Sequence, residues 1–264
     1  MGSAVEEIRL ADFPEQPFLV PAHDQVIRRH VNLRGSWEPG LSAFIGALLP
    51  ADPRVVIGGG HVGLSAFQLW RERPDVSELV VFEPDSVNAG LLALNVWSWG
   101  DNPVRVMPLA LGRASGELTL SRNPANTGDS RLWQSNPAWP SESVLVSALD
   151  DIWHGPLDLL FLDVQGWEPD VLAGAERVIR DERPLLVFEW WPQGLAERGI
   201  DSFEVLAWLE GDLDLRVEIV PAEAGGIHEL MPEATEIRDV RELTQRLLDH
   251  PEQTIHAELF AGAR

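Results

Sequence analysis

The chain of 264 residues is long enough for one large α/β domain or two small ones, and its 45% apolar content is ordinary for a globular protein. Its 42 acidic and 20 basic residues give a net charge of −22, which disfavours nucleic acid as a partner and suits a neutral or cationic small molecule. The absence of Cys, Tyr and Lys excludes thiol nucleophiles, disulfides, Schiff-base chemistry and the lysine of a P-loop.

The first 53 residues are punctuated by proline and are expected to form an N-terminal cap. They predict short strands near Pro17–Val20 and Val26–Val31, followed by a helix around Leu41–Leu49. No apolar run reaches the roughly 20 residues that span a bilayer. The opening MGSAVEEIRL also lacks the order of a signal peptide, so we expect a cytoplasmic protein with no membrane partner.

Residues 54–264 alternate strands with helices, which is typical of βαβ units and a mostly parallel sheet within one structural unit. The expected strands are Arg54–Ile57, Leu79–Phe82, Val104–Pro108, Gly116–Leu120, Leu157–Leu162, Leu185–Phe188, Leu213–Ile219 and Ile227–Leu230. The expected helices are Gly63–Arg73, Ser86–Trp97, Pro169–Arg180, Ser202–Leu209 and Val240–Leu248.

Residues 121–143, SRNPANTGDSRLWQSNPAWPSES, predict a long loop, and loops of this length in compact domains are often functional. Its polar side chains are candidate contacts of a lid over the substrate: Asn126, Asp129, Ser130 and Arg131. Several tryptophans near loops or strand ends could hold a sugar face or a cation, or simply replace tyrosine in packing: Trp133, Trp139, Trp167, Trp190 and Trp191.

The stretch VVIGGGHVG, residues 55–63, contains G-x-G-x-x-G as Gly58, Gly60 and Gly63 between a predicted strand and a predicted helix. Such a turn lets a ligand approach the backbone, and the following helix offers free N–H groups to an anion. Glu83 lies 20 residues later at the end of the next strand, where an acid binds the ribose of an adenosine. These residues alone do not separate a nicotinamide dinucleotide from S-adenosylmethionine.

Several ordered motifs across roughly residues 18–195 resemble the FkbM family of S-adenosylmethionine-dependent methyltransferases. The family's I-D-x-[EQ]-G-x-E-x-x-V-L-x-G-A is matched most fully, by LDVQGWEPDVLAGA at residues 162–175. The other matching stretches are GSWEP at 35–39, IGGGHVG at 57–63, FEP at 82–84, Asn95, ALG at 110–112, SALD at 147–150 and Glu189.

The resemblance implies a class I methyltransferase with a Rossmann-like, mostly parallel seven-stranded sheet flanked by helices, preceded by the cap of residues 1–53. It also implies that the cofactor contacts the following residues: Gly58, Gly59, Gly60, His61, Gly63, Glu83, Pro84, Ala110, Leu111 and Asp163. Ile57 and His61 depart from the family's Asp and Asn. Because the lost Asp usually recognises the methionine ammonium, Glu38 is our candidate for that role.

Asp163 and Glu189 follow neighbouring core strands, and the carboxyl ends of parallel strands face the binding crevice. We therefore expect Asp163 to act as the general base or substrate anchor, with Glu189 as its partner and His61 as a further catalytic candidate. Gln165 would orient substrate or cofactor through its amide. The same two carboxylates could instead hold Mg²⁺, although no third ligand is evident.

The expected activity is methyl transfer to a hydroxyl of a sugar, polyketide or other secondary metabolite, with the acceptor class taken from the resemblance. Its expected substrate contacts are Asn126, Ser130, Arg131, Gln165, Trp167 and Trp191. Two alternatives stay open. An NAD(P)-dependent oxidoreductase could use the glycine loop, although it would lack the Tyr and Lys of a short-chain dehydrogenase, and the Ile57 departure is compatible with a non-catalytic binding protein.

Overall fold

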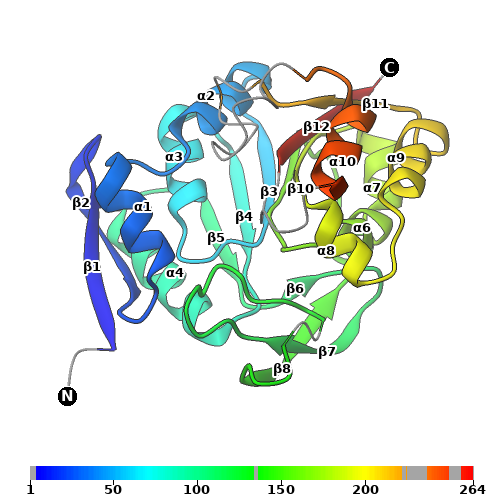
Figure 1. Ribbon diagram of the computed structural model, residues 1–264. Coiled ribbons are helices and arrows are strands. Elements are labelled where there is room, and N and C mark those ends of the chain that lie inside the picture. The colour runs from blue at the N-terminus through cyan, green and yellow to red at the C-terminus, as the bar shows by residue number, and fades with distance from the viewer. Residues whose placement is uncertain (1–3, 134–135, 222–223, 225–236, 250–256, 264) are drawn as a thin grey trace.

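The computed structural model describes residues 4–133, 136–221, 224, 237–249 and 257–263. Seven strands form the central sheet in the order β11-β12-β10-β9-β3-β4-β5, and all of them run parallel except β12 (Figure 1). Their bounds are β3 Arg54–Gly58, β4 Glu78–Phe82, β5 Val104–Met107, β9 Leu159–Leu162, β10 Leu185–Trp190, β11 Leu215–Ile219 and β12 Ala257–Ala263. The expected mostly parallel seven-stranded sheet is thereby confirmed.

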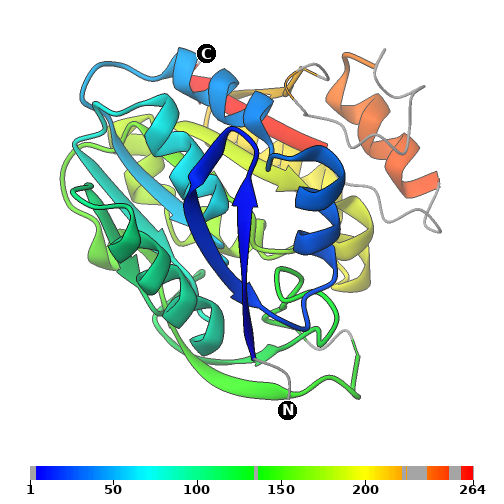
Figure 2. The same ribbon diagram turned by 90° about the vertical axis from the view of Figure 1, so that its left-hand side faces the viewer.

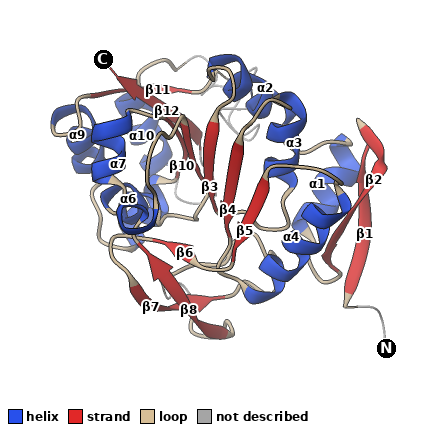
Figure 3. Ribbon diagram, turned by 180° about the vertical axis from the view of Figure 1, so that it is seen from behind, coloured by secondary structure: helices blue, strands red, loops and turns tan. Residues whose placement is uncertain are grey.

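Helices cover both faces of this sheet (Figure 3), so its central strands are buried on both sides and read as continuous apolar runs. One face packs against α2 Pro39–Leu48, α3 Leu64–Glu72 and α4 Ser86–Ser98. The other face packs against α5 Leu149–Ile152, α6 Glu168–Ala173, α7 Glu176–Glu182, α8 Pro192–Glu197, α9 Ser202–Gly211 and α10 Val240–Asp249.

The N-terminal segment forms a hairpin of β1 Val5–Leu10 and β2 Phe13–Pro21, followed by α1 Val26–Arg34 (Figure 2). Asn95 of α4 ties the hairpin to the core, because its side chain both accepts from the Leu19 N–H at 2.8 Å and donates to the Leu19 carbonyl at 3.0 Å. Phe18 packs edge-on against Phe67, and Trp99 stacks on Trp70 with 6.1 Å between ring centroids. The hairpin therefore shares the hydrophobic core of the α2–α4 face.

A second small sheet joins β6 Ala110–Leu111, β7 Gly116–Ser121 and β8 Ser141–Ser147 in the order β6-β8-β7 below the central sheet in Figure 1. The connection between β7 and β8 contains most of the expected long loop. Residues 122–133 of this connection fold back toward α1 and the glycine loop, where Gln25 donates its N–H to the Ala125 carbonyl at 3.2 Å. Within the described residues, no helix has both the length and the apolar character to cross a membrane.

Three expectations about the elements are wrong. The segment Val26–Val31 is helical, because Ile27 and Val31 lie one turn apart on the buried face and Asp24 accepts the N–H groups of Val26 and Ile27 at the helix start. The expected helix Pro169–Arg180 is two helices that separate near Gly174. The end of the expected loop, residues 141–143, belongs to β8, whereas the strand expected at Ile227–Leu230 lies outside the described residues.

Candidate functional site

A cavity of about 340 Å³ opens where β3, β4, β9 and β10 end. The glycine loop, the residues after β4 and β9, the start of α2, and the loop after β7 all contribute to its lining. Carboxyl ends of parallel strands form the usual binding crevice of an open α/β sheet. The cavity therefore lies where the sequence places the functional site.

Gly59 makes the close approach between β3 and β9 possible. Its φ is +86°, and a Cβ built on it would lie 1.7 Å from the carbonyl oxygen of Asp163. The N–H groups of Gly59 and Gly60 both bond to the Phe82 carbonyl, at 3.0 and 2.9 Å, which ties the loop to the end of β4. Only glycine satisfies both the backbone conformation and the lack of space at residue 59.

Glu83 connects the glycine loop to the start of α4. Its buried carboxylate accepts the His61 N–H at 2.7 Å and the Asp85 N–H at 2.8 Å. The pKa of Glu83 is raised to about 8, mainly by burial. The two backbone hydrogen bonds oppose this shift, and the negative charges of Asp85 and Asp163 add to it. Each carboxylate oxygen still has a second lone pair that can accept from a ligand hydroxyl.

A second group of acids lies at the ends of β9 and β10. Gln165 joins Asp163 to Glu189, because its side-chain Nε2 donates to Asp163 at 2.7 Å and to Glu189 at 3.1 Å. The pKa of Asp163 is raised to about 6, mainly by burial. The hydrogen bond from Gln165 opposes this shift, and the charge of Asp129 adds to it. The sequence-based expectation that Asp163 and Glu189 face one crevice is thus matched by their positions in the cavity wall.

Glu38 enters the same cavity from the N-terminal side, immediately before α2. The pKa of Glu38 is raised to about 7, mainly by burial. The nearby charge of Asp163 adds to this shift, and the charge of Arg34 opposes it.

Behind this wall Glu258 of β12 pairs with Glu189 in the sheet register, and its Oε2 is buried with no hydrogen-bond partner in the described part of the chain. Burial, with the charges of Glu38, Asp163 and Glu168, raises the pKa of Glu258 strongly.

Glu168 is the buried acid that shapes the turn after β9. Its carboxylate accepts the N–H groups of Val164 at 3.0 Å and Gly166 at 3.4 Å, so it folds back over the start of α6. Burial raises its pKa to about 7. The Asp163 carboxylate therefore does not cap α6. It accepts a hydrogen bond from Gln165 instead.

Backbone strain occurs at three positions of the cavity wall. Three non-glycine residues of its lining have left-handed backbone conformations: Glu38 with φ 41°, His61 with φ 46° and Gln165 with φ 56°. Each such residue costs on the order of 1–3 kcal/mol, and strain of this kind gathers at binding and catalytic sites. The three strained residues thus present their side chains to one shared space.

The loop after β7 reaches the glycine loop through Thr127. The Thr127 hydroxyl lies 2.8 Å from His61 Nε2 and donates to Asp24 Oδ2 at 2.6 Å, and the Thr127 N–H donates to the same oxygen at 2.8 Å. Asn88 of α4 donates to the Thr127 carbonyl at 3.0 Å. Asp24, whose side chain is fully buried, therefore connects the residues before α1 to the loop and, through Thr127, to His61.

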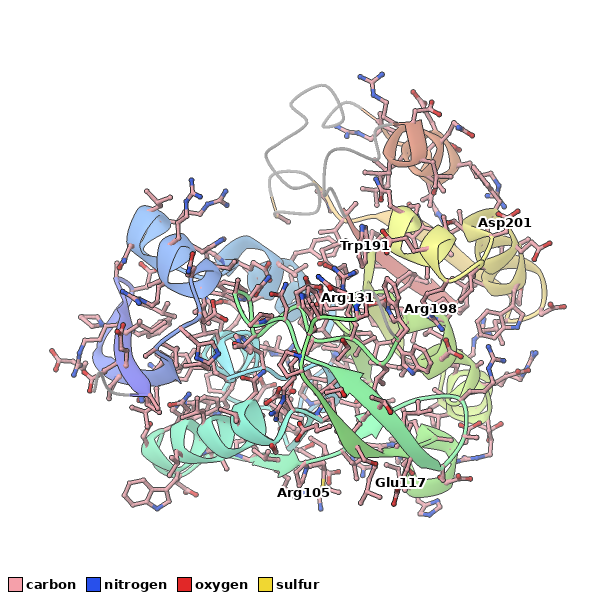
Figure 4. The ribbon with its side chains drawn as sticks, turned by 60° about the horizontal axis from the view of Figure 1, so that its bottom comes forward. Arg105, Glu117, Arg131, Trp191, Arg198 and Asp201 are labelled. Carbon is pink, nitrogen blue, oxygen red and sulfur yellow. The ribbon has the colours of Figure 1, made fainter. Side chains whose placement is uncertain are left out.

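Arg131 lies outside the cavity lining, among tryptophans. Its guanidinium is 4.6 Å from the ring centroid of Trp191, 5.0 Å from that of Trp133 and 5.4 Å from that of Trp139. Asp129 pairs with it at 2.7 Å. In Figure 4 Arg131 and Trp191 lie near each other at the centre of the view. These contacts hold the loop against the start of α8 by cation–π and ionic interactions.

Most of the expected site residues line the cavity: Glu38, Gly59, Gly60, His61, Glu83, Pro84, Ala110, Leu111, Asn126, Ser130, Asp163, Gln165 and Glu189. The remainder lie outside the lining: Gly58 and Gly63 pack against Leu162 and Leu92, Arg131 and Trp191 contact each other, and Trp167 lies under Arg198. Glu38, which the sequence offered as a substitute acid, therefore lines the same cavity as the glycine loop.

Other parts of the site carry no motif in the sequence. The apolar side chains of Val26, Ile27, Leu64 and Leu132 line the cavity, and so does the ring of Trp37, whose Nε1 donates to Ser65 Oγ at 3.2 Å. Asp24 and Thr127 were not predicted as site residues because each is an isolated polar residue outside any motif. No group of three or more His, Asp or Glu side chains suited to a metal ion occurs among the described residues.

Comparison with known proteins adds a family match. The protein-family model described as "Methyltransferase FkbM domain" matches residues 59–217, which is more than half of the chain. No curated protein is similar enough in sequence to count as a match.

Three solved structures show distant similarity. The first is a methyltransferase FkbM from Methylobacillus flagellatus KT, at 20% identity and a TM-score of 0.41 over 55% of this chain and 34% of that one. The second is a precorrin-6y C5,15-methyltransferase from Geobacter metallireducens GS-15, at 11% and 0.45 over 84% and 86%. The third is an O-methyltransferase from Bacillus cereus in complex with SAH, at 11% and 0.45 over 92% and 84%. The match thus spans about a third of the length of the first of these proteins.

Proposed function

Because the chain belongs to the FkbM methyltransferase family, we propose that it methylates a hydroxyl group of a small metabolite with S-adenosylmethionine as the methyl donor. The proposed acceptor class, a sugar, polyketide or similar secondary metabolite, is what the family resemblance implies, and the proposed cytoplasmic location is an expectation from the sequence. When bound, S-adenosylmethionine supplies a methyl group activated by a positive sulfonium. The observation that carries the proposal is the charge of the cavity.

Four carboxylates line the cavity: Glu38, Glu83, Asp163 and Glu189. No arginine occurs among the described lining residues, and the chain contains no lysine. Three of these carboxyl groups have raised pKa values because they are buried, and a bound cation would stabilise their ionised forms. The ammonium and sulfonium of the methyl donor fit such a cavity, whereas the pyrophosphate of NAD(P) would lie among several acidic side chains.

The residues in the cavity suit the separate parts of this cofactor. The open backbone at Gly59 and Gly60 and the start of α3 would lie against the methionine end, with Glu38 and Asp163 available to its ammonium. Glu83 would accept from the ribose hydroxyls, as an acid at the end of the second strand commonly does. Ala110 and Leu111 would pack on the adenine. Glu38 thereby takes over from the acid that Ile57 replaces.

The acceptor would enter between the glycine loop and the loop after β7. Leu120, Leu132 and Ile27 give this part of the cavity apolar walls, and Asn126 and Ser130 give it polar groups. A hydroxyl acceptor must lose a proton, and the imidazole of His61 and the carboxylate of Asp163 both lie in the cavity wall to receive it. The presence of proton acceptors beside the cofactor loop supports O-methylation.

Isothermal titration calorimetry of the full chain with S-adenosylmethionine and with NADPH tests this function. We expect the sulfonium compound to bind and NADPH to give no heat above dilution. Incubation with a panel of hydroxylated metabolites and mass spectrometry should then detect a methylated product. Binding of NADPH without the sulfonium compound would overturn the proposal, and binding without transfer to any hydroxyl or other acceptor would favour a non-catalytic role.

Metal removal is expected to leave methyl transfer unchanged. Asp163 and Glu189 share one amide donor, Gln165, which occupies the space between the two carboxylates where a bridging Mg²⁺ would lie. The measurement is the initial rate of product formation after dialysis against excess EDTA, with added MgCl₂ as the control. A loss of activity that Mg²⁺ restores would show that this pair of acids binds metal.

A further inference from the structure

We propose that Asp24 and Thr127 are positioning residues that hold His61 as a neutral imidazole with its proton on Nε2, so that Nδ1 accepts the proton of the acceptor hydroxyl. This inference rests on the proposed methyl transfer to a hydroxyl. It assigns the proton transfer to His61 and leaves Asp163, with Glu38, to face the positive charge of the methyl donor. The argument begins at Asp24 and follows the hydrogen bonds outward.

Asp24 can only accept hydrogen bonds in this structure. Its Oδ1 receives the N–H groups of Val26 at 2.9 Å and Ile27 at 3.0 Å. Its Oδ2 receives the N–H of Thr127 at 2.8 Å and the Thr127 hydroxyl at 2.6 Å. With two donors on each oxygen, a carboxylate proton would have no place, so the ionised form is the one that these contacts satisfy.

The direction of the next hydrogen bond follows from the proton count of a hydroxyl. The Thr127 hydroxyl has one proton and gives it to Asp24, the charged acceptor at the shorter distance. Its contact with His61 Nε2 at 2.8 Å must then be one in which Nε2–H donates. A neutral imidazole that carries its proton on Nε2 has an unprotonated Nδ1.

The pKa of His61 favours the neutral form. Burial lowers this pKa, although the charges of Asp24 and Asp85 oppose the effect. Glu83, the third acid beside this residue, accepts the His61 backbone N–H. The ring is therefore neutral near pH 7 and retains a lone pair for a proton.

Nδ1 lies on the side of the His61 ring that approaches Gly128 of the loop after β7. It makes no hydrogen bond with any residue in the described ranges, and a Cβ built on Gly128 would lie 3.8 Å from it. His61 and Gly128 both line the cavity, with 18% of the His61 side chain still exposed. Because Gly128 belongs to the loop that would cover the acceptor, Nδ1 lies between the cofactor loop and the expected acceptor site.

The proton transfer balances within this arrangement. His61 Nδ1 gains the proton as the O–H bond of the acceptor breaks, and the acceptor oxygen keeps the electron pair with which it bonds to the transferred methyl carbon. The sulfur of the methyl donor keeps the pair of the broken S–C bond. The imidazolium so formed still donates through Nε2 to Thr127, with Asp24 Oδ2 at 3.9 Å to stabilise its charge.

Nitrogen-15 NMR of the free, uniformly labelled protein tests the tautomer without any activity measurement. His61 is one of seven histidines, and His61→Asn identifies its signals. We expect Nε2 protonated and Nδ1 unprotonated in the native chain. Thr127→Val should give a mixture of tautomers, whereas Thr127→Ser, which keeps the hydroxyl, should retain the native pattern. A proton on Nδ1 in the native protein would overturn the proposal.

The pH dependence of the rate provides the second test. Asp24→Asn should lower the pKa of His61, because the charge of Asp24 raises it, and the acidic limb of kcat should move to lower pH together with the NMR titration. Thr127→Val should reduce kcat about tenfold with an unchanged Kd for S-adenosylmethionine, and Thr127→Ser should restore it.

The outcomes separate the two proposals. An unchanged kcat and pH profile in Thr127→Val, in a protein that still transfers methyl groups, would overturn the role of the relay while methyl transfer stands. Failure of the native protein to bind S-adenosylmethionine, with the Nε2-protonated tautomer observed, would instead reject the proposed function.

Discussion

Gly59→Ala is expected to abolish binding of S-adenosylmethionine and to lower the free energy of unfolding by about 3 kcal/mol or more. The new Cβ would overlap the Asp163 carbonyl oxygen, which lies 1.7 Å from its ideal position, and the φ of +86° is unfavourable for alanine. Relief of the overlap requires β3 and β9 to separate at their ends, where the cavity lies. Urea denaturation and calorimetry with S-adenosylmethionine measure the two effects.

Gly90→Ala is the matched control for this change. Gly90 lies within α4, and a Cβ there would meet no atom within 4 Å. Alanine in a helix interior is expected to stabilise the protein by about 0.5–1 kcal/mol and to leave cofactor binding unchanged. A native-like Kd in Gly59→Ala would show that the glycine loop does not contact the cofactor.

Glu38→Gln is expected to weaken the binding of S-adenosylmethionine by about tenfold to a hundredfold, because a charged hydrogen bond contributes roughly 1.5–3 kcal/mol. Glu38 has a pKa of about 7 in the free protein, and a cationic ligand binds its ionised form. The native Kd should therefore fall as pH rises from 5 to 8, with release of protons. The variant should lose part of this pH dependence, which calorimetry in buffers of different ionisation enthalpy measures.

Although Glu38→Gln is expected to weaken ligand binding, it is expected to stabilise the free protein at high pH. The pKa of Glu38 is raised from 4.5 in the unfolded chain to about 7 in the folded one, so its contribution to stability is full below pH 4.5 and is lost as pH rises through 7. Glu38→Gln should thus raise the Tm of the free protein at pH 8 and leave it nearly unchanged at pH 4. Glu117→Gln, on the exposed face of β7 (Figure 4), should change neither quantity. A lower Tm in Glu38→Gln would mean that misfolding explains any loss of affinity.

The central sheet was predictable from sequence because its strands are buried on both faces. Val55, Val80 and Leu160 all lie in continuous apolar runs, which identify buried strands without any knowledge of their neighbours. The strand prediction at Val26–Val31 was wrong because its β-branched residues favour a strand, whereas the spacing of Ile27 and Val31 fits one face of a short helix. β12 was not recognised because Ala257–Ala263 is rich in small residues and its place depends on pairing with β10 and β11.

The same distinction applies to the site. Glu83, Asp163 and Glu189 were found because the end of a parallel strand is a position that the local sequence reveals. The contact between Asp24 and Thr127 spans 103 positions and depends on the path of a loop, for which no periodic pattern exists. Glu258 depends likewise on the register of an antiparallel strand. Sequence thus predicts the acids at the strand ends, whereas the relay to His61 requires three-dimensional structure.

The stacked indoles of Trp70 and Trp99 give the protein an optical property of its own. Two indole rings whose centroids lie 6.1 Å apart couple their electronic transitions, and we expect this coupling to contribute to the circular dichroism of the indole bands. Phe18 of the N-terminal hairpin packs on Trp99, and the sequence has no tyrosine to overlap with the indole bands. This signal therefore reports whether the hairpin is docked, independently of whether the cavity holds a ligand.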